Sequence, residues 1–185
     1  MRIIYRYLAL VIVTINILSG LCIAKDSQPN AFDVIKELDM NGEKAFISKL
    51  YADAELFRYV ISNIEQASAD WISIAVRLYQ HCQISFCSEM ESAISVALSK
   101  KPRIVLESLS ENSEIESICS APFLIDYPDR EKGLETLKHT EQLLKQIKSD
   151  ELKSKKNLCL KKIEEQISWL QSLMLQVPQL HPKFQ

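Results

Sequence analysis

The most reactive side chains in the sequence belong to five cysteines and three histidines. Cys82 and Cys87 lie five residues apart, and His81 directly precedes the first of them. Cysteine and histidine are zinc ligands, but structural zinc sites use two short Cys/His pairs and this segment supplies one. Redox-active dithiols have a two-residue spacer, whereas four residues separate these cysteines. The pattern favours structural cysteines, and we expect no bound metal and no cofactor.

The cysteine count predicts disulfides. Cys82, Cys87, Cys119 and Cys159 follow the N-terminal segment discussed below, and an even number in an exported chain is typical of a disulfide framework. Three connectivities can be drawn. A turn would bring the Cα atoms of Cys82 and Cys87 within the roughly 4.4–6.8 Å that a bridge needs. We therefore favour Cys82–Cys87 and Cys119–Cys159 over the crossed pairings.

The remaining polar residues carry no catalytic signature. No His-Glu-x-x-His, Gly-x-Ser-x-Gly or Ser-x-x-Lys set with its companions is present. Carboxylate pairs such as Glu89 with Glu91 and Glu114 with Glu116 are two residues apart, so on a helix they point away from each other. The sequence therefore predicts a protein that is not an enzyme.

The first 24 residues have the order of a secretory signal peptide. Arg2 and Arg6 are followed by an uncharged, mostly apolar run over residues 7–23, and Ala24 ends a small-residue cleavage site. We expect residues 1–24 to be removed, residues 25–176 to form a single all-α domain and residues 177–185 to be a C-terminal tail. Two alternatives stay open: an uncleaved anchor, or a lipoprotein modified at Cys22, against which the bulky Leu21 argues.

Charge is divided unevenly along the chain. Residues 25–128 hold 9 basic and 16 acidic side chains, whereas residues 129–185 hold 11 basic and 8 acidic ones. The net charge is therefore −7 in the first part and +3 in the second. Because nucleic-acid binding needs clustered positive charge, the acidic balance excludes DNA or RNA as the expected partner. The lysines of the second part, such as Lys155, Lys156 and Lys162, are largely balanced by neighbouring glutamates.

The hydrophobic spacing predicts helices throughout. Only two glycines, Gly42 and Gly133, follow residue 24. Because tight turns between strands and nucleotide-binding loops need glycine, this low number favours helices. Asp53 and Asp70 are expected N-caps, Pro102 fits a first helical turn, and Tyr51 is expected on an apolar helix face. We predict an irregular all-α bundle of stacked αα-hairpins, HEAT-like at most, with two disulfides and two long C-terminal helices.

Three segments carry a resemblance. They are residues 69–75 (Ala-Asp-Trp-Ile-Ser-Ile-Ala), residues 97–102 (Ala-Leu-Ser-Lys-Lys-Pro) with Val105 and Leu106, and residues 118–123 (Ile-Cys-Ser-Ala-Pro-Phe). Together they resemble a family of small exported helical proteins of Gram-negative bacteria with no assigned function. The resemblance covers about the middle half of the chain. It implies a periplasmic or secreted protein and no particular active residue.

One irregular segment is a candidate for recognition. Two prolines interrupt the apolar stretch over residues 121–128, which therefore cannot continue a helix. Loops carry binding functions more often than helices do. The candidate partner-binding residues are Pro122, Phe123, Leu124 and Tyr127. The alternative is a connector packed over the core.

These observations give an expected function. We expect an exported, non-catalytic helical protein that binds another protein in the periplasm or outside the cell, without stable membrane insertion after cleavage. An immunity or inhibitor protein against a toxin or hydrolase is one alternative. A carrier that encloses an apolar ligand between helices is the other.

The signal-peptide hypothesis is tested by the N-terminus of the native protein. We expect mass spectrometry of a fractionated host to find Lys25 as the first residue in the periplasmic or secreted fraction, because Ala24 ends the cleavage site. A cytosolic protein that begins at Met1 or Arg2 as its sole form would contradict this hypothesis.

Overall fold

The computed structural model describes residues 28–81, 84–120 and 130–176. Within these ranges every regular element is an α-helix, which confirms the all-α prediction. The helices are α2 (Ala31–Asn41), α3 (Glu43–Ala52), α4 (Ala54–Glu65), α5 (Ala69–Tyr79), α6 (Ile84–Lys100), α7 (Pro102–Ser108), α8 (Asn112–Cys119), α9 (Arg130–Lys145) and α10 (Lys153–Gln176).

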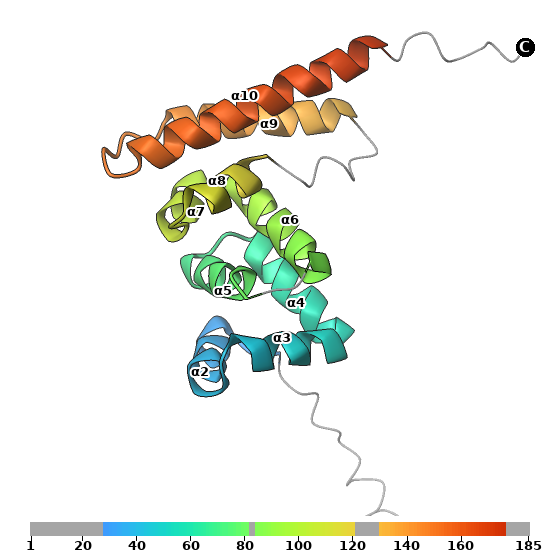
Figure 1. The fold of residues 1–185 in the computed structure, drawn as a ribbon, viewed down its shortest axis with the longest axis vertical. Helices are drawn as coiled ribbons and strands as arrows, with labels where there is room; N and C mark the ends of the chain where they lie inside the picture. Colours follow the sequence, from blue (N-terminus) through green and yellow to red (C-terminus); the bar gives the residue numbers. More distant parts are fainter. Residues whose placement is uncertain (1–27, 82–83, 121–129, 177–185) are drawn as a thin grey trace, which may run out of the picture.

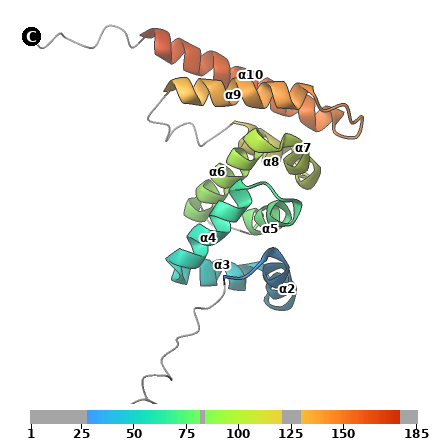
Figure 2. The same cartoon turned by 180° about the vertical axis from the view of Figure 1, so that it is seen from behind.

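The helices stack in two rows. Helices α2, α5, α7 and α9 contact one another in succession, and α4, α6, α8 and α10 form the second succession of contacts. Helix α3 lies at one end against α2, α4 and α5. Figure 1 and Figure 2 show α9 and α10 side by side across the opposite end of the stack. Short connections place consecutive helices side by side from α2 to α7 and again in the α9–α10 pair.

One hydrophobic cluster runs through the whole stack. Its buried side chains extend from Val34 in α2 to Leu170 in α10. Helix α6 contributes Phe86, Met90 and Leu98 among others, and it contacts α4, α5, α7, α8 and α9. A helix surrounded by neighbours buries apolar side chains on most of its circumference. The core is therefore continuous from the N-terminal helices to the C-terminal pair.

Local side chains determine where the helices begin. Asp53 caps α4, because its carboxylate accepts hydrogen bonds from the N–H groups of Glu55 and Leu56 at 2.9 and 3.0 Å. The sequence predicted Asp70 as the N-cap of α5, and this prediction is wrong. Ser68 takes that position and accepts from the N–H of Trp71 at 3.4 Å, whereas Asp70 lies in the first turn. An acidic residue there still favours the helix through the macrodipole.

A glycine is required between α2 and α3. Gly42 has φ of 80°, a conformation that side chains with a Cβ rarely adopt. Its N–H donates to the carbonyl of Leu38 at 2.8 Å, which closes the last turn of α2. The chain can therefore turn from α2 into α3 within a single residue.

Arg77 joins α5 to the α2–α3 corner. Its Nη1 atom lies 2.8 Å from Asp39, and its Nε and Nη2 atoms donate to Glu43 at 3.0 and 2.8 Å. The hydrogen bond from Arg77 is the main reason why the pKa of Glu43 lies below its usual value. A planar guanidinium can serve two carboxylates at once, so one residue orients three helices.

Lysines close helix C-termini across the fold. Lys100 donates to the carbonyl of Glu65 at 2.7 Å, and Lys156 donates to that of Ile147 at 2.9 Å. Lys155 binds the carbonyls of Leu106 and Leu109 at the end of α7. The last carbonyls of a helix have no partner within it, so these ammonium groups satisfy acceptors that would otherwise be left open.

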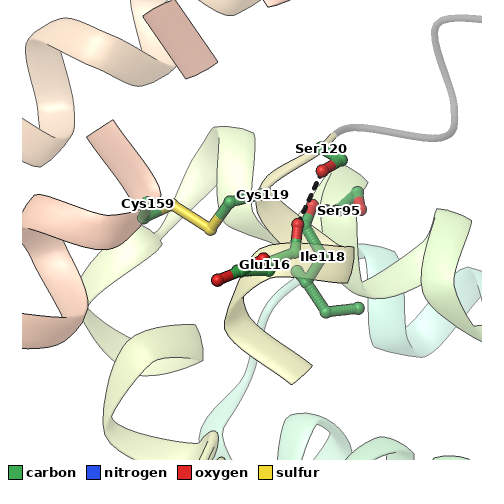
Figure 3. Close-up of a disulfide and its surroundings, with 6 residues drawn as sticks. All are labelled: Ser95, Glu116, Ile118, Cys119, Ser120 and Cys159. Atoms are coloured by element: carbon green, nitrogen blue, oxygen red, sulfur yellow. Dashed lines mark hydrogen bonds between the residues drawn. A yellow bond between two sulfur atoms is a disulfide. The ribbon is translucent and has the colours of Figure 1, made fainter. Parts of the chain in front are cut away.

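A disulfide fastens α10 to α8, as the sequence predicted. Cys119 and Cys159 are bonded with their Cα atoms 5.2 Å apart, and both side chains are fully buried. Next to this bond the buried hydroxyl of Ser95 donates to the carbonyl of Ile118 at 2.8 Å, which ties α8 to α6 (Figure 3). The disulfide and this hydrogen bond thus hold α8 from two sides.

Several predictions lie outside the described residues. These are the signal peptide over residues 1–24, the tail over residues 177–185 and the pairing of Cys82 with Cys87. Cys87 takes part in a disulfide, but Cys82 is not among the described residues, so this pairing stays a prediction. The likeness to HEAT hairpins also stays a prediction. Among the described helices, none combines the length and apolarity that a membrane crossing requires.

The Cys119–Cys159 bond should contribute strongly to stability. It closes a loop of 40 residues, for which chain entropy gives about 4 kcal/mol. We expect the double substitution Cys119→Ser with Cys159→Ser to lower the free energy of urea unfolding by about 2–5 kcal/mol. Ser168→Ala, on the exposed side of α10, serves as the control and should change this free energy little. An unchanged unfolding free energy in the double variant would contradict the prediction.

Candidate functional site

An aromatic groove lies where α3, α4 and α6 meet. We call it the Tyr51 groove, and it has a volume of about 260 Å³. Helix α3 supplies two of its lining residues, α4 supplies two and α6 supplies two. The lining residues are Leu50, Tyr51, Ala54, Phe57, Phe86 and Glu89.

The α3–α4 junction places the groove residues. Asp53 ends α3 and caps α4, so the chain bends between Tyr51 and Phe57 without a loop. The rings of these two residues both pack against the ring of Phe86, with centroid distances of 5.4 and 5.5 Å. Their interplanar angles of 49° and 45° are tilted geometries that aromatic pairs prefer to a face-to-face sandwich.

The groove combines an apolar surface with one charge. Phe86 is buried, whereas 52% of the Tyr51 surface stays exposed although its ring packs against Phe86. The carboxylate of Glu89 stands exposed beside these rings. Aromatic rings, aliphatic carbons and one carboxylate can bind an apolar side chain accompanied by a positive charge. None of the six lining side chains forms a nucleophile–base pair.

A second polar cluster joins α5, α6 and α8. Glu91 accepts hydrogen bonds from the hydroxyls of Tyr79, at 2.7 Å, and of Ser117. Burial and the bond to Glu91 raise the pKa of Tyr79. A general acid or base needs a pKa near the working pH, so a raised tyrosine pKa moves this group away from such a role. The cluster fits a role in holding α8 against α5 and α6.

Glu114 is the buried carboxylate of this region, with 8% of its surface exposed. Its carboxylate accepts hydrogen bonds from the Gln80 side chain at 2.9 Å and from the N–H groups of Ser110 and Glu111 at 3.0 and 3.1 Å. Burial by itself raises the pKa of Glu114, but these hydrogen bonds outweigh it and keep the pKa below the usual value. Glu114 therefore stays ionised and links α8 to the end of α5.

The structure brings two of the predicted site residues together. Cys119 and Cys159 are bonded to each other. Cys82 and the candidate loop residues Pro122, Phe123, Leu124 and Tyr127 lie outside the described residues. Over residues 28–81, 84–120 and 130–176 no group of three His, Cys, Asp or Glu side chains gathers as metal ligands would. The expectation that no metal binds stays a prediction.

The Tyr51 groove was not predicted from the sequence. The spacing placed Tyr51 on the apolar face of its helix, whereas the structure leaves half of its surface exposed. The reason is that helical periodicity identifies an apolar face but not how far its neighbours cover it. Tyr51 gave one usable signal, since tyrosine is enriched among the residues that dominate the binding energy of protein interfaces.

Comparison with known proteins adds no relative from which a function can be transferred: no family model, no curated protein and no solved structure matches the chain.

The lowered pKa of Glu114 predicts a pH-dependent stability. Because the folded-state pKa lies below the ordinary value of 4.5, the stabilisation is complete above that value. It is lost as the pH falls through the folded-state pKa, because the unfolded chain binds the proton first. In Glu114→Gln we expect a smaller difference in urea-unfolding free energy between pH 7 and about pH 3 than in the wild type.

Glu55→Gln is the matched control, because that side chain is exposed on α4. It should keep the wild-type difference between the two pH values. Equal pH dependence in Glu114→Gln and the wild type would show that Glu114 does not couple protonation to folding.

Proposed function

We propose that this chain is an exported, non-catalytic binding protein that works in the periplasm or outside the cell. Its Tyr51 groove receives an apolar side chain of a partner protein, and a lysine or arginine beside that side chain meets Glu89. The observation that carries the proposal is the half-exposed Tyr51 ring packed over Phe86 within an apolar groove. Aromatic residues of this kind dominate the binding energy of protein interfaces.

Charge complementarity supports a basic partner segment. Glu89 lines the groove, and residues 25–128, which include all of α2 to α8, carry a net charge of −7. A segment with positive charge would be attracted to this part of the chain and would associate faster at low salt. The partner surface that fits best is therefore an apolar anchor flanked by Lys or Arg.

The volume of the groove supports a side chain rather than a whole ligand. Pockets for small molecules usually enclose about 300–1,000 Å³ and bury most of the ligand. The Tyr51 groove offers about 260 Å³ and leaves Tyr51 half exposed. These properties favour protein binding over the carriage of an apolar molecule. An immunity or inhibitor protein is the special case in which the partner is a toxin or hydrolase.

The compartment belongs to the same proposal. The Cys119–Cys159 disulfide favours an oxidising environment, since such bonds are rare in proteins of the reducing cytosol. The expected signal peptide and the expected Cys82–Cys87 bond point the same way. Stacked helix hairpins, as in HEAT-type arrays, would provide an extended surface on which a partner can lie.

The proposal is tested by cross-linking from inside the groove. A photoreactive phenylalanine analogue at position 51 should cross-link one partner in periplasmic or secreted fractions, because Tyr51 would contact it directly. The matched control carries the same analogue at position 169, because Trp169 is equally exposed at 52% but lies on α10. Identical cross-linked products from both positions, or none from position 51, would overturn the proposal.

The cross-linked partner then allows an affinity measurement. We expect Tyr51→Ala to raise the Kd about tenfold or more and Glu89→Lys to raise it as well, since one removes the aromatic anchor and the other repels a basic neighbour. Trp169→Ala and Glu135→Lys change an aromatic ring and an exposed carboxylate far from the groove and should leave the Kd nearly unchanged. Unchanged affinity in both groove variants would contradict the assigned surface.

A further inference from the structure

A second cleft lies at the other end of the molecule, where the start of α7 meets the end of α9. We call it the cationic cleft, and it has a volume of about 530 Å³. One wall comes from the α6–α7 junction, and the other comes from the last turn of α9 and the residues that follow. The lining residues are Lys101, Pro102, Arg103, Leu143, Gln146, Ile147, Lys148 and Ser149.

Among the described residues, three cations and no carboxylate line this cleft, and the carboxylates nearest to it, Glu107 and Glu151, both act on Arg103. Lys101 and Lys148 are exposed, and neither makes an ion pair or hydrogen bond through its ammonium group with the described residues. Arg103 donates from Nε to Glu107 at 2.8 Å, which leaves the other N–H donors of its guanidinium for a ligand. Among the lysines of the described residues, others close helix ends, as Lys155 and Lys156 do. Lys101 and Lys148 make no such contact through their ammonium groups with the described residues.

The floor of the cleft is apolar. Pro102 is buried at the first position of α7, and Ile147, two residues after the end of α9, is 8% exposed. Lys156 binds the carbonyl of Ile147 at 2.9 Å, so the end of α9 is fixed by α10. The cations therefore stand around an apolar floor that the helix packing holds in place. A ligand that matches it carries negative groups with an apolar group between them.

We propose that the cationic cleft binds an acidic peptide segment of a partner protein, with an apolar side chain on the floor and carboxylates beside Lys101, Arg103 and Lys148. This inference rests on the proposed function and adds a second contact to it. Three cations are too few for nucleic acid, which needs an extended basic face. A membrane surface would need exposed large apolar side chains around the cleft. In the described part of the chain these are Phe32, Met40, Tyr51, Trp169 and Leu175, and they lie elsewhere.

The test uses a fluorescein-labelled synthetic peptide of alternating glutamate and leucine, and measures its Kd by fluorescence anisotropy. A matched peptide with glutamine in place of glutamate reports the contribution of charge. We expect the acidic peptide to bind the wild type with a Kd below about 1 mM, and the glutamine peptide to bind at least about tenfold more weakly. Raising the NaCl concentration from about 50 to 300 mM should raise the Kd of the acidic peptide, because salt screens the ion pairs between peptide and protein.

Variants locate the site. The double substitution Lys101→Ala with Lys148→Ala should raise the Kd about tenfold, because it removes two of the three cations. The control, Lys36→Ala with Lys44→Ala, removes the same charge from exposed positions on α2 and α3 and should change the Kd less than about twofold. Thermal unfolding followed by circular dichroism should be the same for both double variants and the wild type.

Three results would overturn the inference. The first is equal binding of the two peptides, and the second is unchanged affinity in the Lys101 and Lys148 variant. The third is displacement of the peptide by inorganic pyrophosphate at lower concentration than by the unlabelled peptide, which would assign the cleft to a small oxyanion. Tyr51→Ala should leave the affinity for the acidic peptide unchanged. A failure at the cationic cleft is therefore distinguishable from a failure at the Tyr51 groove.

Discussion

The burial of α6 is the constraint on which the rest of the structure depends. This helix contacts α4, α5, α7, α8 and α9, and its buried residues include Phe86, Met90, Ile94 and Leu98. A helix enclosed on so many sides sets the positions of its neighbours, because close packing tolerates little displacement. Its first turns supply Phe86 to the Tyr51 groove. Its later turns supply the Ser95 hydroxyl that fixes α8, so one helix connects the candidate site with the C-terminal part of the fold.

Polar groups then determine how the outer helices attach to this core. Lys155 and Lys156 at the start of α10 bind carbonyls at the ends of α7 and α9, and the Cys119–Cys159 bond joins α10 to α8. Glu114 makes a comparable connection between α8 and the end of α5. These contacts satisfy buried or half-buried groups that would cost free energy if left without partners. The C-terminal hairpin is therefore attached by a disulfide, by hydrogen bonds and by apolar contacts together.

The Tyr51 groove and the cationic cleft lie at different ends of the molecule and differ in charge and shape. The Tyr51 groove lies among α3, α4 and α6 and carries a carboxylate, whereas the cationic cleft lies between α7 and α9 and carries three cations. The net charge is −7 for residues 25–128, which hold the groove together with Lys101 and Arg103, and +3 for residues 129–185, which hold Lys148. A partner with a basic, apolar segment and an acidic segment could engage both ends. Such an arrangement would specify the orientation of the partner as well as its identity.

The sequence by itself determined the elements and one of the covalent links. Capping by Asp53 and the hydrophobic spacing act within a few residues, so local chemistry was sufficient to predict the helices. The short spacing of Cys82 and Cys87 then left Cys119 to pair with Cys159. The groove and the cleft were decided by the tertiary structure. Tyr51 meets Phe86, and Lys101 faces the end of α9, only after helices distant in sequence have packed. Periodicity fixes which face of a helix is apolar, but the exposure of that face depends on which neighbours cover it.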